Sequence, residues 1–285
     1  MRVAFHLLDV FAETPFAGNQ LCVVPEPPDG LSDDAMQTIA CEIGFSETTY
    51  ATALRKDGYD VRIFTPVSEL PFAGHPTLGT AFMLASLGLV PASVVQTSAA
   101  GEVPVDVDLE SGTGTMRQLP PAFEKPLLDR VAVAHAAGLE PADLGDGEIV
   151  PVSTGLCHIM VPVAGEEALR RASRDEAGCV RVCADAEAES LYLFTIRGQG
   201  DVMARMFDRS REIGEDPATG SAAGPLGAYL ATHHLAGMPG RCTIAQGEVV
   251  GRPSFLHVEA HQVNAGWNIR VGGGVRIVGE GAFQI

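Results

Sequence analysis

Two short segments of the chain carry almost the same pattern of residues that can bind a ligand or exchange a proton with it. They read His75-Pro76-Thr77-Leu78-Gly79-Thr80-Ala81 and Asp216-Pro217-Ala218-Thr219-Gly220-Ser221-Ala222. About half of the 285 residues separate the two copies, and each copy opens an apolar run typical of a helix. Proline suits the first turn of a helix, and glycine lets a ligand approach the backbone. Helix starts also present free N–H groups that hold anions. We therefore expect two similar lobes that face one small anionic substrate.

Glu47 is a third candidate for proton chemistry. It stands in an otherwise neutral stretch, residues 43–54, just after an apolar segment. Partial burial there raises the pKa of a carboxyl towards neutrality, so that one group can act as both acid and base. The competing interpretation is a solvated surface glutamate. His75 and Asp216, which precede the two prolines, are the other candidate catalytic residues.

A second internal repeat brings in Asn19. The sequence Pro-Phe-Ala-Gly occupies residues 15–18 before Asn19 and residues 71–74 before His75. If the two turns are equivalent, Asn19 lies beside the same cleft as His75 and can hydrogen-bond a substrate carboxylate. An ordinary turn asparagine explains the residue equally well.

A helix is predicted to deliver the chain to Glu47. Ser32 suits the N-cap, and apolar residues recur with helical spacing up to residue 43. Gly44 is typical of a helix end. The next residues are β-branched and aromatic, which favours a strand that contains Glu47.

The two repeat helices are predicted to run from the first copy to about Gly88 and over about 219–231. Pro225 is expected to kink or shorten the second of them. Both halves of the chain order their elements as strands, one apolar helix and more strands, in hairpin-like groups. We therefore predict an α+β protein of two pseudo-symmetric lobes, each a curled, mostly antiparallel sheet around a central helix.

The lobe boundary is predicted in the polar, proline-containing stretch near 118–126. This gives an N-terminal lobe of residues 1–120 and a C-terminal lobe of residues 121–285, whose last strand can return to the first lobe. Within the second half, residues 175–189 are interpreted as a connection and 248–250 as a strand. The run Gly272-Gly273-Gly274 is interpreted as a turn between two final strands.

Composition narrows the possible partners. The formal net charge of −17 and the pI near 4.7 argue against nucleic acid and against an anionic membrane. The six cysteines have no paired metal spacing and are interpreted as reduced, mostly buried thiols of a cytoplasmic protein. His257 and His261 lack the order of a metalloprotease motif, so no metal site is predicted. Nucleotide-binding glycine motifs and a serine-nucleophile elbow are not found in the sequence.

The longer motifs resemble the phenazine-biosynthesis PhzF-like family along essentially the whole chain. The matching segments, in the order and spacing of the family, are residues 9–11, 15–19, 46–49, 62–66, 69–81 and 214–224. The resemblance implies the diaminopimelate-epimerase-like fold, with the site in the cleft between two lobes. It also implies a homodimer and an isomerase that uses no cofactor.

The resemblance also assigns roles to individual residues. Glu47 matches the single glutamate that moves a proton between two carbons of trans-2,3-dihydro-3-hydroxyanthranilate in the phenazine enzyme. His75, Asp216, Gly74 and Ser221 match positions that touch the substrate or assist the proton shift. We include Gly220 and Asn19 among the substrate-binding residues.

Three functions remain open from the sequence. The first is an isomerase of a small carboxylic acid that resembles the phenazine enzyme. The second is an epimerase or racemase of an amino or hydroxy acid, with Glu47 and Asp216 as its two acid/base groups. The third is a metabolite-binding protein without catalysis. Neither repeat contains a cysteine, which disfavours the two-thiol chemistry of related racemases.

Overall fold

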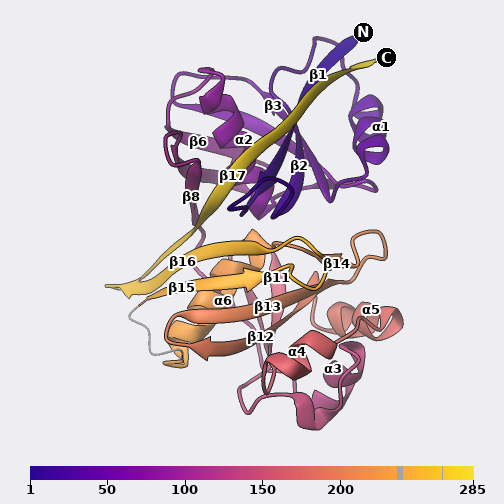
Figure 1. Ribbon diagram of the computed structural model, residues 1–285, viewed down its shortest axis with the longest axis vertical. Helices are drawn as coiled ribbons and strands as arrows, with labels where there is room; N and C mark the ends of the chain where they lie inside the picture. The colour runs from indigo at the N-terminus through magenta and orange to yellow at the C-terminus, as the bar shows by residue number, and fades with distance from the viewer. Residues whose placement is uncertain (236–239, 265) are drawn as a thin grey trace. The chain divides into compact units, whose positions relative to one another are not determined.

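The computed structural model describes residues 1–235, 240–264 and 266–285 as a mixed α/β fold (Figure 1). The chain divides into two compact units. Unit 1 comprises residues 1–117 and 272–285, and unit 2 comprises residues 118–271. Within the described residues, no helix is both long and apolar enough to cross a membrane.

Unit 1 is a closed ring of eight strands. The pairings run from β1 through β2, β3, β4, β6, β7 and β8 to β17, which pairs with β1 again. Closure leaves none of these eight strands as a free edge. The strands of unit 1 are β1 (Arg2–Val10), β2 (Asn19–Val24), β3 (Glu47–Thr52), β4 (Gly58–Phe64), the short β5 (Glu69–Leu70) beside β4, β6 (Ser93–Ser98), β7 (Gly101–Asp108), β8 (Thr113–Gln118) and β17 (Gly266–Gln284). The last residue of β8 and residues 266–271 of β17 belong to unit 2.

Helix α2 (Gly74–Ser86) lies inside this ring (Figure 1). Every residue from 74 to 85 is buried, because the helix is apolar on all its faces and strands contact it from several sides. Pro76 lies in its first turn, as predicted for the first copy of the repeat.

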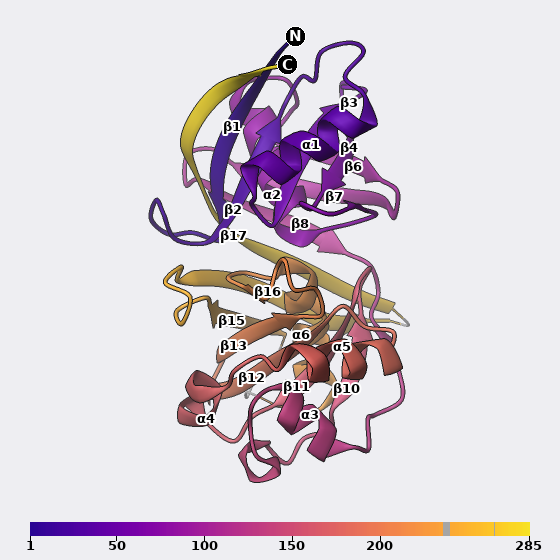
Figure 2. The same cartoon turned by 90° about the vertical axis from the view of Figure 1, so that its right-hand side faces the viewer.

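Helix α1 (Asp33–Ile43) covers the outside of unit 1 (Figure 2). The predicted caps are confirmed: the Ser32 side chain accepts from the backbone N–H of Ala35, and Gly44 adopts the left-handed conformation that ends the helix. Buried Met36 and Ile39 pack with Tyr50 of β3. This packing fixes the strand on which Glu47 lies.

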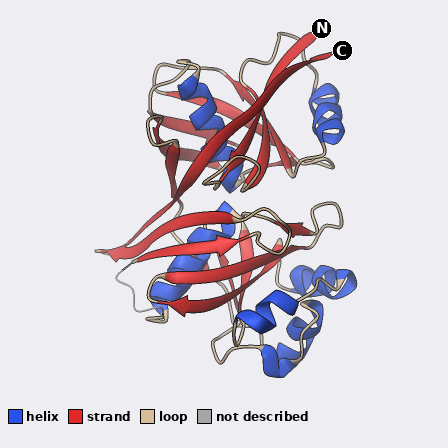
Figure 3. Cartoon of the chain, viewed as in Figure 1, coloured by secondary structure: helices blue, strands red, loops and turns tan. Residues whose placement is uncertain are grey.

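The predicted turn at residues 272–274 is wrong, since β17 runs unbroken through it from Gly266 to Gln284 (Figure 3). The glycines serve close backbone contacts. A Cβ atom on Gly272 would lie 2.6 Å from the Gly114 carbonyl oxygen, and one on Gly274 would lie 2.3 Å from that of Ala12. Glycine is required here because neighbouring backbone passes too near for any side chain.

Unit 2 contains the other described strands, which belong to the same hydrogen-bonded sheet, and helices lie on both faces of these strands. Its strands are β9 (Ala122–Phe123), β10 (Val150–Ser153), β11 (Cys157–Pro162), β12 (Ser190–Gly198), β13 (Asp201–Asp208), the short β14 (Glu215–Asp216), β15 (Arg241–Gln246) and β16 (Ser254–Val263). Its helices are α3 (Arg130–Ala136), α4 (Glu166–Arg171), α5 (Glu176–Asp185) and α6 (Gly220–Thr232). Helices α3 to α5 cover strands β11 to β13 through one apolar cluster (Figure 2).

Helix α6 is the central helix of unit 2, and residues 220–230 are buried. It begins at Gly220 with Thr219 as N-cap, so Pro217 lies before the helix and not in its first turn. The two copies of the repeat therefore differ in where their helices start. The helix continues through Pro225 to Thr232, so the expected shortening is wrong. Proline is tolerated there because packing, not one backbone hydrogen bond, holds a buried helix.

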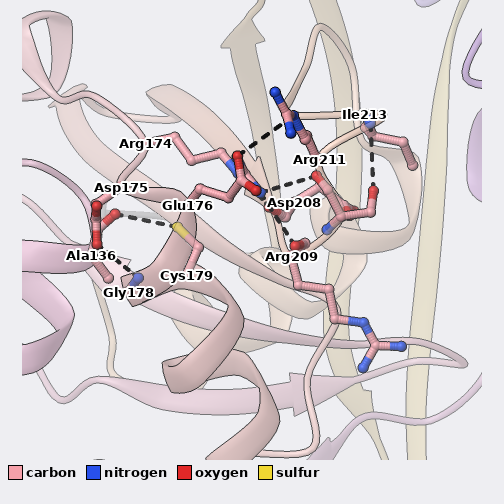
Figure 4. Close-up of polar contacts among 11 residues, drawn as sticks. Ala136, Arg174, Asp175, Glu176, Gly178, Cys179, Asp208, Arg209, Arg211 and Ile213 are labelled. Atoms are coloured by element: carbon pink, nitrogen blue, oxygen red, sulfur yellow. Dashed lines mark hydrogen bonds and ion pairs between the residues drawn. The ribbon is translucent and has the colours of Figure 1, made fainter.

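Helix α5 occupies part of the segment that the sequence analysis interprets as a connection (Figure 4). Asp175 is its N-cap and accepts from the Gly178 N–H at 2.7 Å. Cys179 donates to the Ala136 carbonyl of α3 at 3.2 Å. A Cβ on Gly178 would lie 2.9 Å from the Ala136 Cα, so glycine permits close packing of α5 on α3. This tertiary contact explains a helix that local composition does not indicate.

The predicted strand at 248–250 is also wrong, because these residues form a turn. The N–H of Gly251 bonds to the Glu248 carbonyl at 3.1 Å, and that of Arg252 to Gly247 at 2.9 Å. Gly247 and Gly251 both have positive φ. Glycines at such positions reverse the chain between β15 and β16.

Candidate functional site

Unit 1 brings together Asn19, Glu47 and His75. Glu47 is the first residue of β3, Asn19 the first of β2, and His75 lies in the first turn of α2. The Glu47 Oε2 atom is 3.3 Å from His75 Nε2, and Asn19 Nδ2 is 3.1 Å from His75 Nδ1. All three side chains are buried. The predicted neighbourhood of Asn19 and His75 is therefore present in the structure.

The hydrogen bonds around His75 orient its ring. Ser46 Oγ donates to Asn19 Oδ1 at 3.2 Å, which turns the Asn19 amide nitrogen towards His75 Nδ1. Burial lowers the pKa of His75 to about 3 in spite of a hydrogen bond with the Gln20 backbone that raises it, so the ring is neutral at physiological pH. With a neutral ring, the 3.3 Å approach of His75 Nε2 to Glu47 Oε2 is a close polar contact that has neither the geometry of a hydrogen bond nor the charge of an ion pair.

A series of hydrogen-bonded, buried polar side chains holds the first turn of helix α2 in place. Tyr59 donates to Gln96 at 2.9 Å, and Gln96 donates to Thr77 at 2.7 Å. Thr77 donates in turn to the carbonyl of Ala73, the N-cap residue, at 2.8 Å. This series connects strands β4 and β6 to the first turn of the helix, and so fixes the position from which His75 extends.

Asp216 lies in unit 2 within a second set of polar contacts. Thr219 Oγ1 donates to Asp216 Oδ2 at 2.6 Å. Gln246 Nε2 donates to the Asp216 carbonyl at 2.8 Å and to Thr219 Oγ1 at 2.9 Å, while Tyr192 donates to Gln246 Oε1 at 2.9 Å. The Asp216 side chain is only 6% exposed. Because Thr219 receives its hydrogen bond from Gln246, its own proton is directed to the carboxylate.

Ser221 lies one residue into α6 from Gly220 and contacts a histidine that the sequence analysis did not single out. Its Oγ atom is 3.0 Å from His158 Nε2, and His158 Nδ1 is 2.8 Å from Ser190 Oγ. Burial lowers the pKa of His158 to about 3. Gln118 is a further unpredicted residue, since its Nε2 donates to the Gly220 carbonyl at 2.8 Å.

Gly74 and Gly220 are the first residues of α2 and α6. Both are buried.

The sequence signal for His158, Gln118 and Gln246 was weak, because each residue lies far along the chain from the residue that it contacts. The available signal was a polar side chain within a predicted strand or at its end. Among the described residues, no group of three or more histidine, cysteine or acidic side chains can hold a metal ion.

The pKa values of the two buried histidines predict how the stability of the fold depends on pH. For both, the folded-state pKa of about 3 lies below the ordinary value of 6.5. As the pH falls from about 6.5 towards 3, the histidines of the unfolded chain bind protons and those of the folded chain do not. The free energy of unfolding therefore decreases over this pH range. The expected loss is about 1.4 kcal/mol per pH unit for each histidine.

Urea unfolding of the wild type and of His158→Gln at pH 5 and pH 6 measures this effect. The difference in unfolding free energy between the two pH values should be smaller in the variant by the contribution of one histidine. His75→Gln serves as an independent second variant. Equal pH dependence in the wild type and both variants would contradict the prediction.

Comparisons with known proteins agree with the motifs. The family model for phenazine biosynthesis-like proteins matches residues 8–281. The uncharacterized isomerase YddE of Escherichia coli O157:H7 is 35% identical over 277 residues, with 90% of each chain covered. Trans-2,3-dihydro-3-hydroxyanthranilate isomerase of Pseudomonas aeruginosa is 34% identical over 284 residues, which cover 97% of this chain and 95% of that enzyme. A PhzF-family phenazine biosynthesis protein of Bacillus anthracis superimposes with a TM-score of 0.90 at 27% identity, and all of both chains is covered. The family resemblance is thereby confirmed.

Proposed function

We propose that this chain, which belongs to the phenazine biosynthesis-like protein family, is an isomerase of a small carboxylic acid. The reaction is a proton transfer from one carbon of the substrate to another, and it uses no cofactor. Two relatives that are more than 30% identical along most of the chain are named isomerases, which supports the reaction class.

The observation that carries this proposal is the contact between Glu47 and His75. Glu47 is 8% exposed, and its Oε2 atom lies 3.3 Å from His75 Nε2. Neutral His75 restricts the position of the carboxylate through this close contact and adds no positive charge. A carboxylate held in this way is available to remove a proton from carbon and to return it, which is general base followed by general acid catalysis by one group.

The roles that we propose for unit 2 are substrate binding and orientation. Asp216 has one carboxylate oxygen bonded to Thr219, which restricts the rotation of its side chain. Ser221 and Gly220 lie at the N-terminal end of α6, where the helix dipole favours a negatively charged group. Asp216 orients the substrate or stabilises its anion, and Ser221 contributes a hydroxyl group.

An epimerase is the second candidate, because each unit contains a buried carboxylate, Glu47 in unit 1 and Asp216 in unit 2. Two such groups can remove a proton from one face of a carbon and return it to the other. The difference between the two reactions lies in where the proton ends. An isomerase delivers the proton to a different carbon, whereas an epimerase returns it to the same carbon with inverted configuration.

Turnover in heavy water tests these alternatives. The protein is incubated with trans-2,3-dihydro-3-hydroxyanthranilate and, separately, with small amino and hydroxy acids, and the products are analysed by proton NMR. We expect a product whose double bond has moved and whose new C–H or C–D bond lies on a different carbon. Inverted configuration with deuterium at the original carbon identifies an epimerase instead. Binding without any exchange or turnover contradicts both enzymatic assignments.

A further inference from the structure

Three buried polar side chains form a single line that ends at Ser221. Ser190 is the first residue of β12 and His158 the second residue of β11, and these two residues are partners in the parallel pairing of the strands. Ser190 Oγ is 2.8 Å from His158 Nδ1, and His158 Nε2 is 3.0 Å from Ser221 Oγ. Ser190 and His158 are at most 1% exposed and Ser221 is 6% exposed.

Hydrogen-bond counting fixes the direction of this line. A neutral imidazole has one donor and one acceptor, so it must donate to one serine and accept from the other. Across the described parts of the chain, Ser190 Oγ has His158 as its one hydrogen-bond partner. If His158 donated to Ser190, the Ser190 proton would have no acceptor at a position that is 0% exposed. In the opposite arrangement the Ser221 proton has no acceptor among the described residues, but Ser221 keeps an exposure of 6%, so an unsatisfied proton costs less there. Ser190 therefore donates to Nδ1.

The direction at Ser190 determines what Ser221 can do. With Nδ1 accepting, the ring proton is on Nε2 and is donated to Ser221 Oγ. The Ser221 oxygen then already accepts a hydrogen bond, and its own proton remains available for a group outside this line. That proton lies in the first turn of α6, next to Gly220, whose carbonyl is occupied by Gln118. The group that it suits is a hydrogen-bond acceptor, such as a carboxylate.

We propose that His158 and Ser190 are positioning residues that hold Ser221 as a hydrogen-bond donor to the carboxylate of the substrate. Neither residue touches the substrate. This assignment rests on the proposed function only for the identity of the acceptor. The direction of the hydrogen bonds follows from the structure of unit 2 alone.

The tautomer of His158 gives a first test that needs no substrate. Protein labelled with nitrogen-15 in histidine is examined by long-range proton–nitrogen NMR, and the His158 signals are assigned with His158→Gln. We expect a neutral ring with the proton on Nε2 in the wild type. A proton on Nδ1 overturns the proposal, even if the protein proves to be an isomerase.

Kinetics with trans-2,3-dihydro-3-hydroxyanthranilate give the second test. Ser190→Ala is expected to raise KM about tenfold or more with little change in kcat, because a hydrogen bond to a charged group is weakened in the ground state and the transition state alike. In a Ser221→Ala background, Ser190→Ala should have no further effect on KM. His158→Gln, whose amide N–H can still donate to Ser221, should retain more affinity than His158→Leu.

Ser153→Ala is the matched control. Ser153 is a half-buried serine of β10 that pairs with Cys157, and its hydroxyl accepts from the Gly155 N–H rather than from a member of this line. It should leave KM unchanged, and urea unfolding of all variants separates lost stability from lost binding. Equal KM values for Ser190→Ala and the wild type, or additive effects of the two serine substitutions, overturn the proposal. If the substrate is not turned over at all, the proposed function fails and the NMR measurement alone decides the positioning role.

Discussion

Replacement of Glu47 by glutamine is expected to lower kcat by about 10²- to 10⁴-fold, the range over which general acid and base groups contribute. Glutamine has nearly the same size and shape as glutamate but cannot take up and return a proton at neutral pH. The backbone of residue 47 pairs with Leu21 of β2, and this pairing does not depend on the side chain. The fold should therefore remain intact while the chemistry is lost.

Steady-state kinetics and calorimetric titration with trans-2,3-dihydro-3-hydroxyanthranilate check this expectation. The dissociation constant should change by less than about tenfold, because the lost interaction acts mainly in the transition state. Glu110→Gln is the matched control, since Glu110 is exposed in the turn between β7 and β8. It should leave kcat unchanged. Full activity of the Glu47 variant would refute the assignment of Glu47 as the proton carrier.

Substitution of Gly274 by alanine should destabilise the protein by about 3 kcal/mol or more, the upper part of the range for overpacked sites. The new Cβ would lie 2.3 Å from the carbonyl oxygen of Ala12, and this oxygen belongs to backbone that cannot rotate away. The two segments are also held together by a hydrogen bond from the Ala12 N–H to the Gly274 carbonyl, 3.0 Å long. The strand must move or this bond must break.

Gly279 of the same strand supplies the control. A Cβ on Gly279 has as its nearest neighbour the Leu7 Cδ1 atom at 3.6 Å, an ordinary contact distance. Gly279→Ala should therefore change the unfolding free energy by no more than about 0.5 kcal/mol. Urea denaturation of both variants measures the difference. Equal stability of Gly274→Ala and Gly279→Ala would show that β17 is not constrained at residue 274.

Local patterns in the sequence were sufficient to predict the structure of segments whose conformation is decided by neighbouring residues. The caps of α1 depend on Ser32 and Gly44, which satisfy backbone groups within their own turn, so they are readable without a fold. The first copy of the repeat likewise places Pro76 in the first turn of α2. The repeated turn before Asn19 and His75 indicated their proximity, and the structure places them 3.1 Å apart.

Where distant backbone or side chains decide the structure, the sequence misleads. Residues 272–274 have the composition of a turn, yet they continue β17 because Gly114 and Ala12 pass within contact distance. Helix α5 has few local helix signals beyond its N-cap, and its packing on α3 stabilises it. In the second copy of the repeat, Pro217 stays outside α6 although the pattern matches the first copy.

The sequence by itself determined the family, and with it Glu47, His75 and Asp216 as candidates, because long ordered motifs retain residue identities. The tertiary structure alone decided which groups orient them. His158 is 63 residues from Ser221 along the chain, and Asn19 is 56 from His75. Such contacts depend on strand register and on burial, which also keeps both imidazoles neutral. Protonation and hydrogen-bond direction are properties of the folded surroundings, and no single segment of the sequence contains them.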